Sequence, residues 1–240
     1  MQFFSVKIRV LGLALIAFSY TATGLLTGCS SVTSHQSSTP HQTTTEVGTQ
    51  PEGAPNHAGD NMNHGHNMNQ MMSMDLGPAD SDYDLRFIDG MILHHQGAIE
   101  MAKEVLNQSQ RPEIKKLAND IIASQNQEIQ AMKQWRQAWY PQADSKPVAY
   151  SAQMGHQTKM TPEQGQEMMM KTDLGATDSQ FDLRFINAMI PHHQGAVVMA
   201  QDALNKSKRP EIQKLAQAII ADQQREITQM QQWRKAWYQQ

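Results

Sequence analysis

An internal duplication constrains the fold of this chain more than any other feature of its sequence. Residues 83–140 align without a gap with residues 181–238, at an offset of 98 positions, and 37 of the 58 aligned pairs are identical. The same offset relates the tripeptide Asp-Leu-Gly at 75–77 to its copy at 173–175. Two copies of so long a unit do not make a solenoid, which stacks many shorter repeats. The duplication therefore predicts two fused copies of one small unit.

Each copy has the periodicity of two amphipathic helices. In the first copy, apolar side chains recur at spacings of three and four from Phe87 to Val105, and again from Ile114 to Trp139. The first helix is expected to end near Asn107, and the prolines at 112 and 210 are typical of a helix start. The expected N-terminal caps are Asp80, Ser81 or Asp82 in the first copy and Asp178 or Ser179 in the second.

Each copy is therefore predicted to be a helical hairpin, and about 60 residues bury too little surface to favour two separate domains. We expect an all-α, ferritin-like four-helix bundle, built from two duplicated helical hairpins and preceded by a disordered tail. Pro191, which replaces Leu93 of the first copy, is expected to kink its helix. The tryptophans are expected to close one end of the bundle; they are Trp135, Trp139, Trp233 and Trp237.

The composition divides the chain into five regions. We assign residues 1–28 to a signal peptide of the lipoprotein type and 29–75 to a flexible Met/His-rich tail. The hairpins occupy 76–142 and 176–240. Between them, 143–175 forms a Met-rich linker, in which Thr161-Pro162-Glu163-Gln164 predicts a capping box and a short helix.

The N-terminus has the pattern of an exported lipoprotein. Lys7 and Arg9 precede an apolar run that ends in Leu26-Thr27-Gly28-Cys29, and such a run is typical of a secretory signal rather than a membrane span. Cys29 is the single cysteine of the chain and stands where lipidation would occur. We therefore predict an extracytoplasmic protein, in the periplasm or cell envelope, held to a membrane by a lipid anchor. The alternative is an ordinary signal peptide with an incidental cysteine.

Histidine and methionine gather in patterns that suggest a soft-metal site. The repeated stretch His-His-Gln-Gly-Ala lies on a helix in both copies, with a methionine three residues before its first histidine and another seven residues after it. The candidate ligands in the helices are Met91, His94, His95, Met101 and Met132 in the first copy and Met189, His192, His193, Met199 and Met230 in the second. Further candidates are His57, Met62, His64, His66, Met68, Met71, Met72 and Met74 in the tail and His156 and Met160 in the linker.

The donor types select the metal. Imidazole and thioether donors without thiolate favour Cu(I), and by the same softness Ag(I), whereas structural zinc would favour cysteines and calcium would need oxygen clusters. Glu128 and Glu226 lie on or beside the apolar stripes of the partner helices and are the expected hydrogen-bond acceptors of the histidines. Methionine and histidine on an apolar face can also be ordinary core residues, and that alternative stays open.

The repeated motif also carries a family resemblance. Phe87-Ile88-x-x-Met91-Ile92-x-His94-His95-Gln96-Gly97-Ala98-x-x-Met101-Ala102, its copy at 185–200, and Trp135-Arg136-x-x-Trp139 with its counterpart resemble the domain-of-unknown-function family numbered 305. The resemblance covers about residues 75–240. It implies a ferritin-like bundle that binds Cu(I) and Ag(I) outside the cytoplasm and supports copper tolerance. It places ligands at Met91, His94, His95 and Met101 and at their second-copy equivalents.

The sequence therefore predicts a non-enzymatic copper-binding protein for copper sequestration, transfer and tolerance. Its expected partners are metal ions, a copper efflux or delivery protein, and a membrane through the lipid anchor. A net charge of −3 gives no basic surface for nucleic acid. Two alternatives remain, a ferritin-like di-metal carboxylate oxidoreductase and an envelope interaction module without metal. The carboxylate class uses Glu-x-x-His pairs, and here methionine stands three residues before each first histidine.

Overall fold

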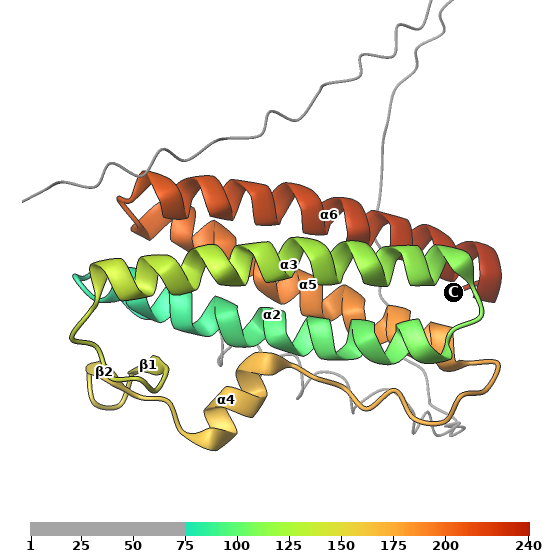
Figure 1. Cartoon of the computed structure of the whole chain (residues 1–240), viewed down its shortest axis with the longest axis horizontal. Coiled ribbons are helices and arrows are strands. Elements are labelled where there is room, and N and C mark those ends of the chain that lie inside the picture. The colour runs from blue at the N-terminus through green and yellow to red at the C-terminus, as the bar shows by residue number, and fades with distance from the viewer. Residues whose placement is uncertain (1–74) are drawn as a thin grey trace, which may run out of the picture. The chain divides into compact units, whose positions relative to one another are not determined.

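Four long helices form the bundle in the computed structural model, which describes residues 75–240 (Figure 1). They are α2 (Tyr83–Gln108), α3 (Pro112–Trp139), α5 (Phe181–Lys206) and α6 (Pro210–Tyr238). The predicted all-α architecture of two helical hairpins is confirmed, because α2 packs on α3 and α5 packs on α6. The predicted signal peptide, the lipidated Cys29 and the tail up to residue 74 lie outside the described residues. None of the helices in residues 75–240 is long and apolar enough to cross a membrane.

The helices α2 and α5 start in the same way, but the predicted side-chain caps are wrong. The N-cap residues are Asp82 and Gln180, and neither makes a side-chain capping hydrogen bond. Asp80 and Asp178 instead accept hydrogen bonds from the backbone two residues later, and each forms an ion pair with an arginine of its own helix, Arg86 or Arg184. The carboxylates of Asp80 and Asp178 therefore stabilise the turns before α2 and α5 and do not cap these helices.

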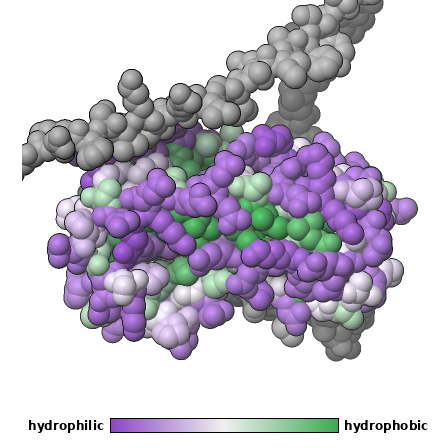
Figure 2. All heavy atoms as spheres, in the orientation of Figure 1, coloured by the Kyte–Doolittle hydropathy of each residue, from purple (hydrophilic) through white to green (hydrophobic). Residues whose placement is uncertain are grey.

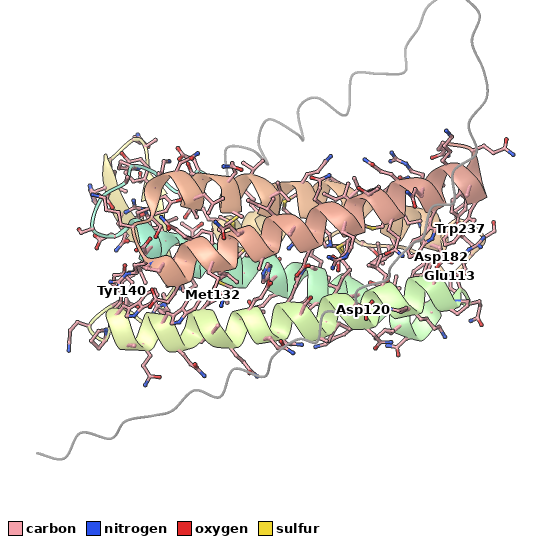
Figure 3. All side chains as sticks on the ribbon, turned by 90° about the horizontal axis from the view of Figure 1, so that it is seen from above. Glu113, Asp120, Met132, Tyr140, Asp182 and Trp237 are labelled. Atoms are coloured by element: carbon pink, nitrogen blue, oxygen red, sulfur yellow. The ribbon has the colours of Figure 1, made fainter. Side chains whose placement is uncertain are left out.

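The two hairpins pack against each other in opposite directions. Arg111, in the α2–α3 turn, lies 4.3 Å from the ring centre of Trp237 near the end of α6, and Arg209 lies 4.2 Å from that of Trp139 near the end of α3. The helix α3 separates Arg111 from Trp139 by its whole length, about 40 Å at 1.5 Å per residue. Figure 3 shows Tyr140 and Trp237 at opposite ends of the bundle. The prediction that all four tryptophans close one end is therefore wrong, since each end receives one stacked pair.

The linker between the hairpins is more structured than predicted. It contains an antiparallel pair of strands, β1 (Val148–Ser151) and β2 (His156–Lys159), before α4 (Pro162–Met169). The capping box at Thr161 and Gln164 is formed, and α4 ends in a left-handed residue, Met170. A hairpin this short is marginal by itself. It is held against α2 by Asp89, which accepts a hydrogen bond from the backbone nitrogen of Val148.

The core divides into two buried clusters, and each contains side chains from both repeats. The first runs from Tyr83 to Ile99 on α2 and includes Met199 and Ile212 of the second repeat. The second contains Met101 and Ile114 together with residues of α5 and α6. The helix α5 continues through Pro191 without interruption. Figure 2 shows one narrow apolar band along an otherwise largely hydrophilic face.

Candidate metal centre

The four histidines of the repeated motif lie at the contact between α2 and α5, fully buried. The ring centres of His94 and His192 are 3.9 Å apart, although the two residues belong to different repeats. His95 and His193 flank this pair, with ring centres 6.5 Å from His94 and 6.2 Å from His192, respectively. From the sequence alone, the candidate ligands of the two repeats formed separate sets. The structure instead brings the first histidine of each repeat into one shared centre.

A glutamate holds each outer histidine. The Nε2 atom of His95 lies 2.6 Å from a carboxylate oxygen of Glu128, and that of His193 lies 2.7 Å from one of Glu226. These are the acceptors that the sequence spacing predicted. When such an imidazole is neutral and donates its Nε2–H to the carboxylate, its Nδ1 carries the free lone pair. The glutamates therefore select the nitrogen that each outer histidine can offer to a ligand.

The inner histidines are unusually poor in hydrogen bonds. Among residues 75–240, both ring nitrogens of His94 are buried without a partner, and so is the Nδ1 of His95, His192 and His193. The Nε2 of His192 has one partner, the backbone oxygen of Met169 at 3.1 Å. Buried polar atoms in proteins are nearly always paired, and leaving one unpaired costs about 1–3 kcal/mol. Five unpaired imidazole nitrogens in this histidine cluster are the pattern expected of a site that binds an external ligand.

Burial keeps the inner pair uncharged. Desolvation, reinforced by the neighbouring histidines, holds the pKa of His94 well below its usual value. Desolvation also lowers the pKa of His192 to about 3, with a further lowering from His193. Metal binding to imidazole requires the neutral ring. Both residues are therefore in the ligand form throughout the neutral pH range.

The core methionines are grouped in a cross-repeat arrangement. Met91 and Met132 of the first repeat share a buried cluster with Met199 of the second. The equivalent residues share the other cluster; they are Met101, Met189 and Met230. All six side chains are completely buried. The sequence grouped Met91 and Met101 in one site, but ten helical residues separate them by about 15 Å. Because α2 and α5 run in opposite directions, each cluster contains methionines from both repeats.

The linker candidates lie away from this core. His156 is exposed on β2, with its Nδ1 2.9 Å from the backbone oxygen of Met154. Met160 is half-buried at the edge of a surface cleft. The eight tail candidates, from His57 to Met74, lie outside the described residues. Within residues 75–240, no three His, Cys, Asp or Glu side chains converge to hold a metal ion.

Sequence reasoning missed the backbone contribution of α4. A Cβ atom on Gly97 would lie 1.8 Å from the carbonyl oxygen of Met169, the same oxygen that faces His192. Gly97 therefore lets the end of α4 approach α2 closely enough to reach the centre. Any residue can supply a backbone carbonyl oxygen, so the sequence does not reveal this acceptor. The one available signal was Gly97, because a glycine inside a helical motif usually has a packing or functional reason.

Comparisons with known proteins agree with the fold. The solved structure of CopM in its Cu(II)-bound form is 43% identical, covers 65% of this chain and 97% of its own, and superposes with a TM-score of 0.52. CopM in its Cu(I)-bound form is 41% identical with the same coverage and a TM-score of 0.51. A DUF305 fragment from Deinococcus radiodurans is 30% identical, covers 64% of this chain and 95% of its own, and has a TM-score of 0.51.

One further relative has a shorter match. The uncharacterized protein L153 of Acanthamoeba polyphaga mimivirus is 49% identical over 49 residues, which is 20% of this chain, and the match spans 32% of the length of that relative. The family described as a domain of unknown function, DUF305, matches residues 84–234, which contain all four long helices apart from their outermost residues. The chain belongs to the DUF305 family.

Proposed function

We propose that this protein binds Cu(I), and with it Ag(I), at the four-histidine centre, and that it sequesters and hands on copper outside the cytoplasm. The observation that carries the proposal is the contact between His94 and His192, buried together with unpaired ring nitrogens beside two clusters of methionines. Neutral imidazole and thioether are the donors that a soft monovalent ion prefers. The solved structures of CopM in copper-bound and silver-bound forms support this choice of metal.

The arrangement favours a cargo site over a catalytic one. The nearest carboxylates, Glu128 and Glu226, are each engaged with a histidine. A di-metal carboxylate enzyme needs several carboxylates directed at the metals. In the proposed role the glutamates orient His95 and His193, and the metal receives nitrogen and sulfur alone. Such a site binds the ion without supplying an acid or base to a substrate.

The wider cellular role follows from the N-terminal region. A signal peptide that ends at Cys29 would place the bundle outside the cytoplasm on a lipid anchor, and the Met/His-rich tail would capture ions close to it. Binding of copper there would support copper tolerance, with an efflux or delivery protein as the acceptor of the ion. These steps rest on the sequence pattern of residues 1–75.

Anaerobic titration with Cu(I) against a chromophoric chelator tests the proposal. The mature chain should retain copper, and the double variant His94→Ala/His192→Ala should lose the tightest bound ion while the tail continues to bind. His156→Ala is the matched control, because His156 is exposed on β2 whereas the inner pair is fully buried, and its tightest bound ion should be retained as in the wild type. A wild type that retains no copper contradicts the proposal. Equal titrations of the double variant and the wild type would move the site to the tail.

A further inference from the structure

The buried centre needs a route by which an ion can arrive. All four histidines and the six clustered methionines are sealed from solvent. A surface cleft of about 320 Å³ lies beside α2, where the start of the described chain meets β1 and α4. Its lining includes two thioethers, Met160 and Met168, and two carboxylates, Asp75 and Glu167. Carboxylates attract a cation to the cleft, and thioethers bind a soft one.

Met168 connects the cleft with the core. It lines the cleft and is itself 4% exposed. Its methyl group lies 3.4 Å from the position of a Cβ atom on Gly90, and the methyl group of Met199 lies 3.3 Å from the same point. The missing side chain at Gly90 therefore lets two methionines from separate segments become neighbours. At the equivalent position the second repeat has alanine, Ala188.

The path continues from Met199 to the histidines. Met199 shares its buried cluster with Met91 and Met132, and Met91 precedes His94 by three residues on the same helix face. The next residue of α4, Met169, faces His192 with its backbone oxygen. The segment that lines the cleft therefore also touches the centre. Arg86 lies on the cleft wall, but its guanidinium is bound to the backbone oxygens of Leu76 and Pro78 and to Asp80.

We propose that this cleft is the port through which a soft monovalent metal ion enters, with Met160 and Met168 as a transient thioether site that passes the ion to Met199 and then to the histidines. Each step exchanges one neutral ligand for the next, thioether sulfur for thioether sulfur and finally for the nitrogen of a neutral imidazole, at an unchanged oxidation state, so the transfer needs no electron or proton donor. The inference rests on the proposed metal site, and it assigns to Met160 and Met168 a kinetic role instead of a storage role.

Stopped-flow transfer of Cu(I) from a chromophoric chelator complex to the mature chain tests the port. The phase that belongs to the centre is the one absent from His94→Ala/His192→Ala. In Met160→Leu/Met168→Leu this phase is expected to slow by about tenfold, with the final amount of bound copper unchanged. Met154→Leu is the matched control, since Met154 is exposed in the turn between β1 and β2, and its rate should equal that of the wild type. Circular dichroism and thermal unfolding check that each variant is folded.

Two results would overturn the port. The first is an unchanged rate in Met160→Leu/Met168→Leu, which would mean that ions enter elsewhere. The second is that this variant binds one equivalent of copper less while the rate of the histidine-dependent phase is unchanged. That result would mean that the cleft stores an ion and does not pass it on. Both differ from failure of the metal site itself, in which the wild type shows no histidine-dependent phase.

A second variant keeps the test independent of ligand loss. Gly90→Ala places a methyl group next to both Met168 and Met199 and recreates the residue of the second repeat. It leaves every sulfur and nitrogen atom in place. The transfer phase is expected to slow in this variant as well, and a rate equal to that of the wild type would contradict the step from Met168 to Met199.

Discussion

Arg136 on α3 holds the buried carboxylate of Asp89 on α2 with two hydrogen bonds, of 2.5 and 3.0 Å. The same carboxylate accepts a hydrogen bond from Val148 of β1, and Arg136 also donates to the backbone oxygen of Asp144 in the linker. In the second repeat the pair is Asn187, which is exposed, and Arg234, which is half-buried, and one bond of 3.2 Å joins them. The two repeats differ clearly at this pair of positions, because in the first repeat the pair also binds the linker.

Replacing Asp89 by the second repeat's residue should loosen the linker. We expect Asp89→Asn to lower the free energy of unfolding by about 1–3 kcal/mol, since a buried, doubly bonded charge partner of Arg136 is lost. Urea unfolding measures the change, and limited proteolysis near residues 141–161 should become faster. The control is Asn187→Ala, which removes an exposed bond and should cost less than about 0.5 kcal/mol. An equal effect of the two variants would contradict a special role for Asp89.

Adjacent histidines should respond oppositely to the same substitution. His94→Leu removes two unpaired buried nitrogens, so the metal-free protein should become more stable by about 1 kcal/mol. His95→Leu leaves Glu128 without its partner and should destabilise the protein by about 1–3 kcal/mol. In both variants the stabilisation by added Cu(I) should shrink. Thermal unfolding with and without the ion measures these changes, and a destabilised His94→Leu would show that His94 is a satisfied core residue.

The metal-free protein should lose stability as the pH falls below about 6.5. The folded-state pKa of His94 lies well below the ordinary value and that of His192 is about 3, so the unfolded chain binds protons first. Between pH 6.5 and the folded pKa, each such histidine lowers the free energy of unfolding by up to about 1.4 kcal/mol per pH unit. The loss assigned to His192 should continue to about pH 3.

Comparison with His192→Leu isolates this effect from the titration of carboxylates, which both proteins share. Urea unfolding at pH 7.5, 6.0 and 5.0 should show a steeper decline in the wild type than in the variant. Parallel curves would mean that His192 is protonated as readily in the folded chain as in the unfolded one.

A methyl group at Gly97 should push α4 away from the bundle. In Gly97→Ala the new Cβ atom would meet the carbonyl oxygen of Met169 at 1.8 Å, which requires backbone movement. We expect a loss of about 1–3 kcal/mol in the free energy of unfolding and faster proteolysis of α4. Gly165→Ala is the control within α4 itself, because no atom of the described residues lies within 4 Å of its Cβ position. If Gly97→Ala is as stable as the control, the close approach of α4 is not required.

The fold could be predicted because its signals are local and doubled. Pro112 and Pro210 mark helix starts, and the spacing of three and four marks the buried faces. The sequence also named Glu128 as an acceptor for a histidine, since it lies on or beside the apolar stripe of the partner helix, but the structure was needed to show that the histidine is His95. Helix starts, buried helix faces and contacts within one hairpin could therefore be inferred from the residues of that hairpin.

Relations between the hairpins could not be predicted in the same way. The grouping of Met91 with Met199 depends on the antiparallel crossing of α2 and α5, and the separation of Trp139 from Trp237 has the same cause. The strands β1 and β2 depend on Asp89, a contact from a residue 59 positions away from Val148. These features arise from tertiary packing, which overrides the weak local preferences of the linker.

Because α2 and α5 cross, one hairpin supplies only part of the candidate metal ligands in each cluster. A single repeat carries one ring of the facing pair, His94 or His192, and its methionines fall into two different clusters. One repeat by itself would have to pair with a second copy to complete a centre, and the two subunits of such a symmetric dimer would be identical. Joining the two copies in one chain allows their sequences and surroundings to differ. The joining segment lays β1 and α4 on α2 of the first repeat, so the two repeats of the fused protein have unequal surroundings, which a symmetric dimer of hairpins would not give.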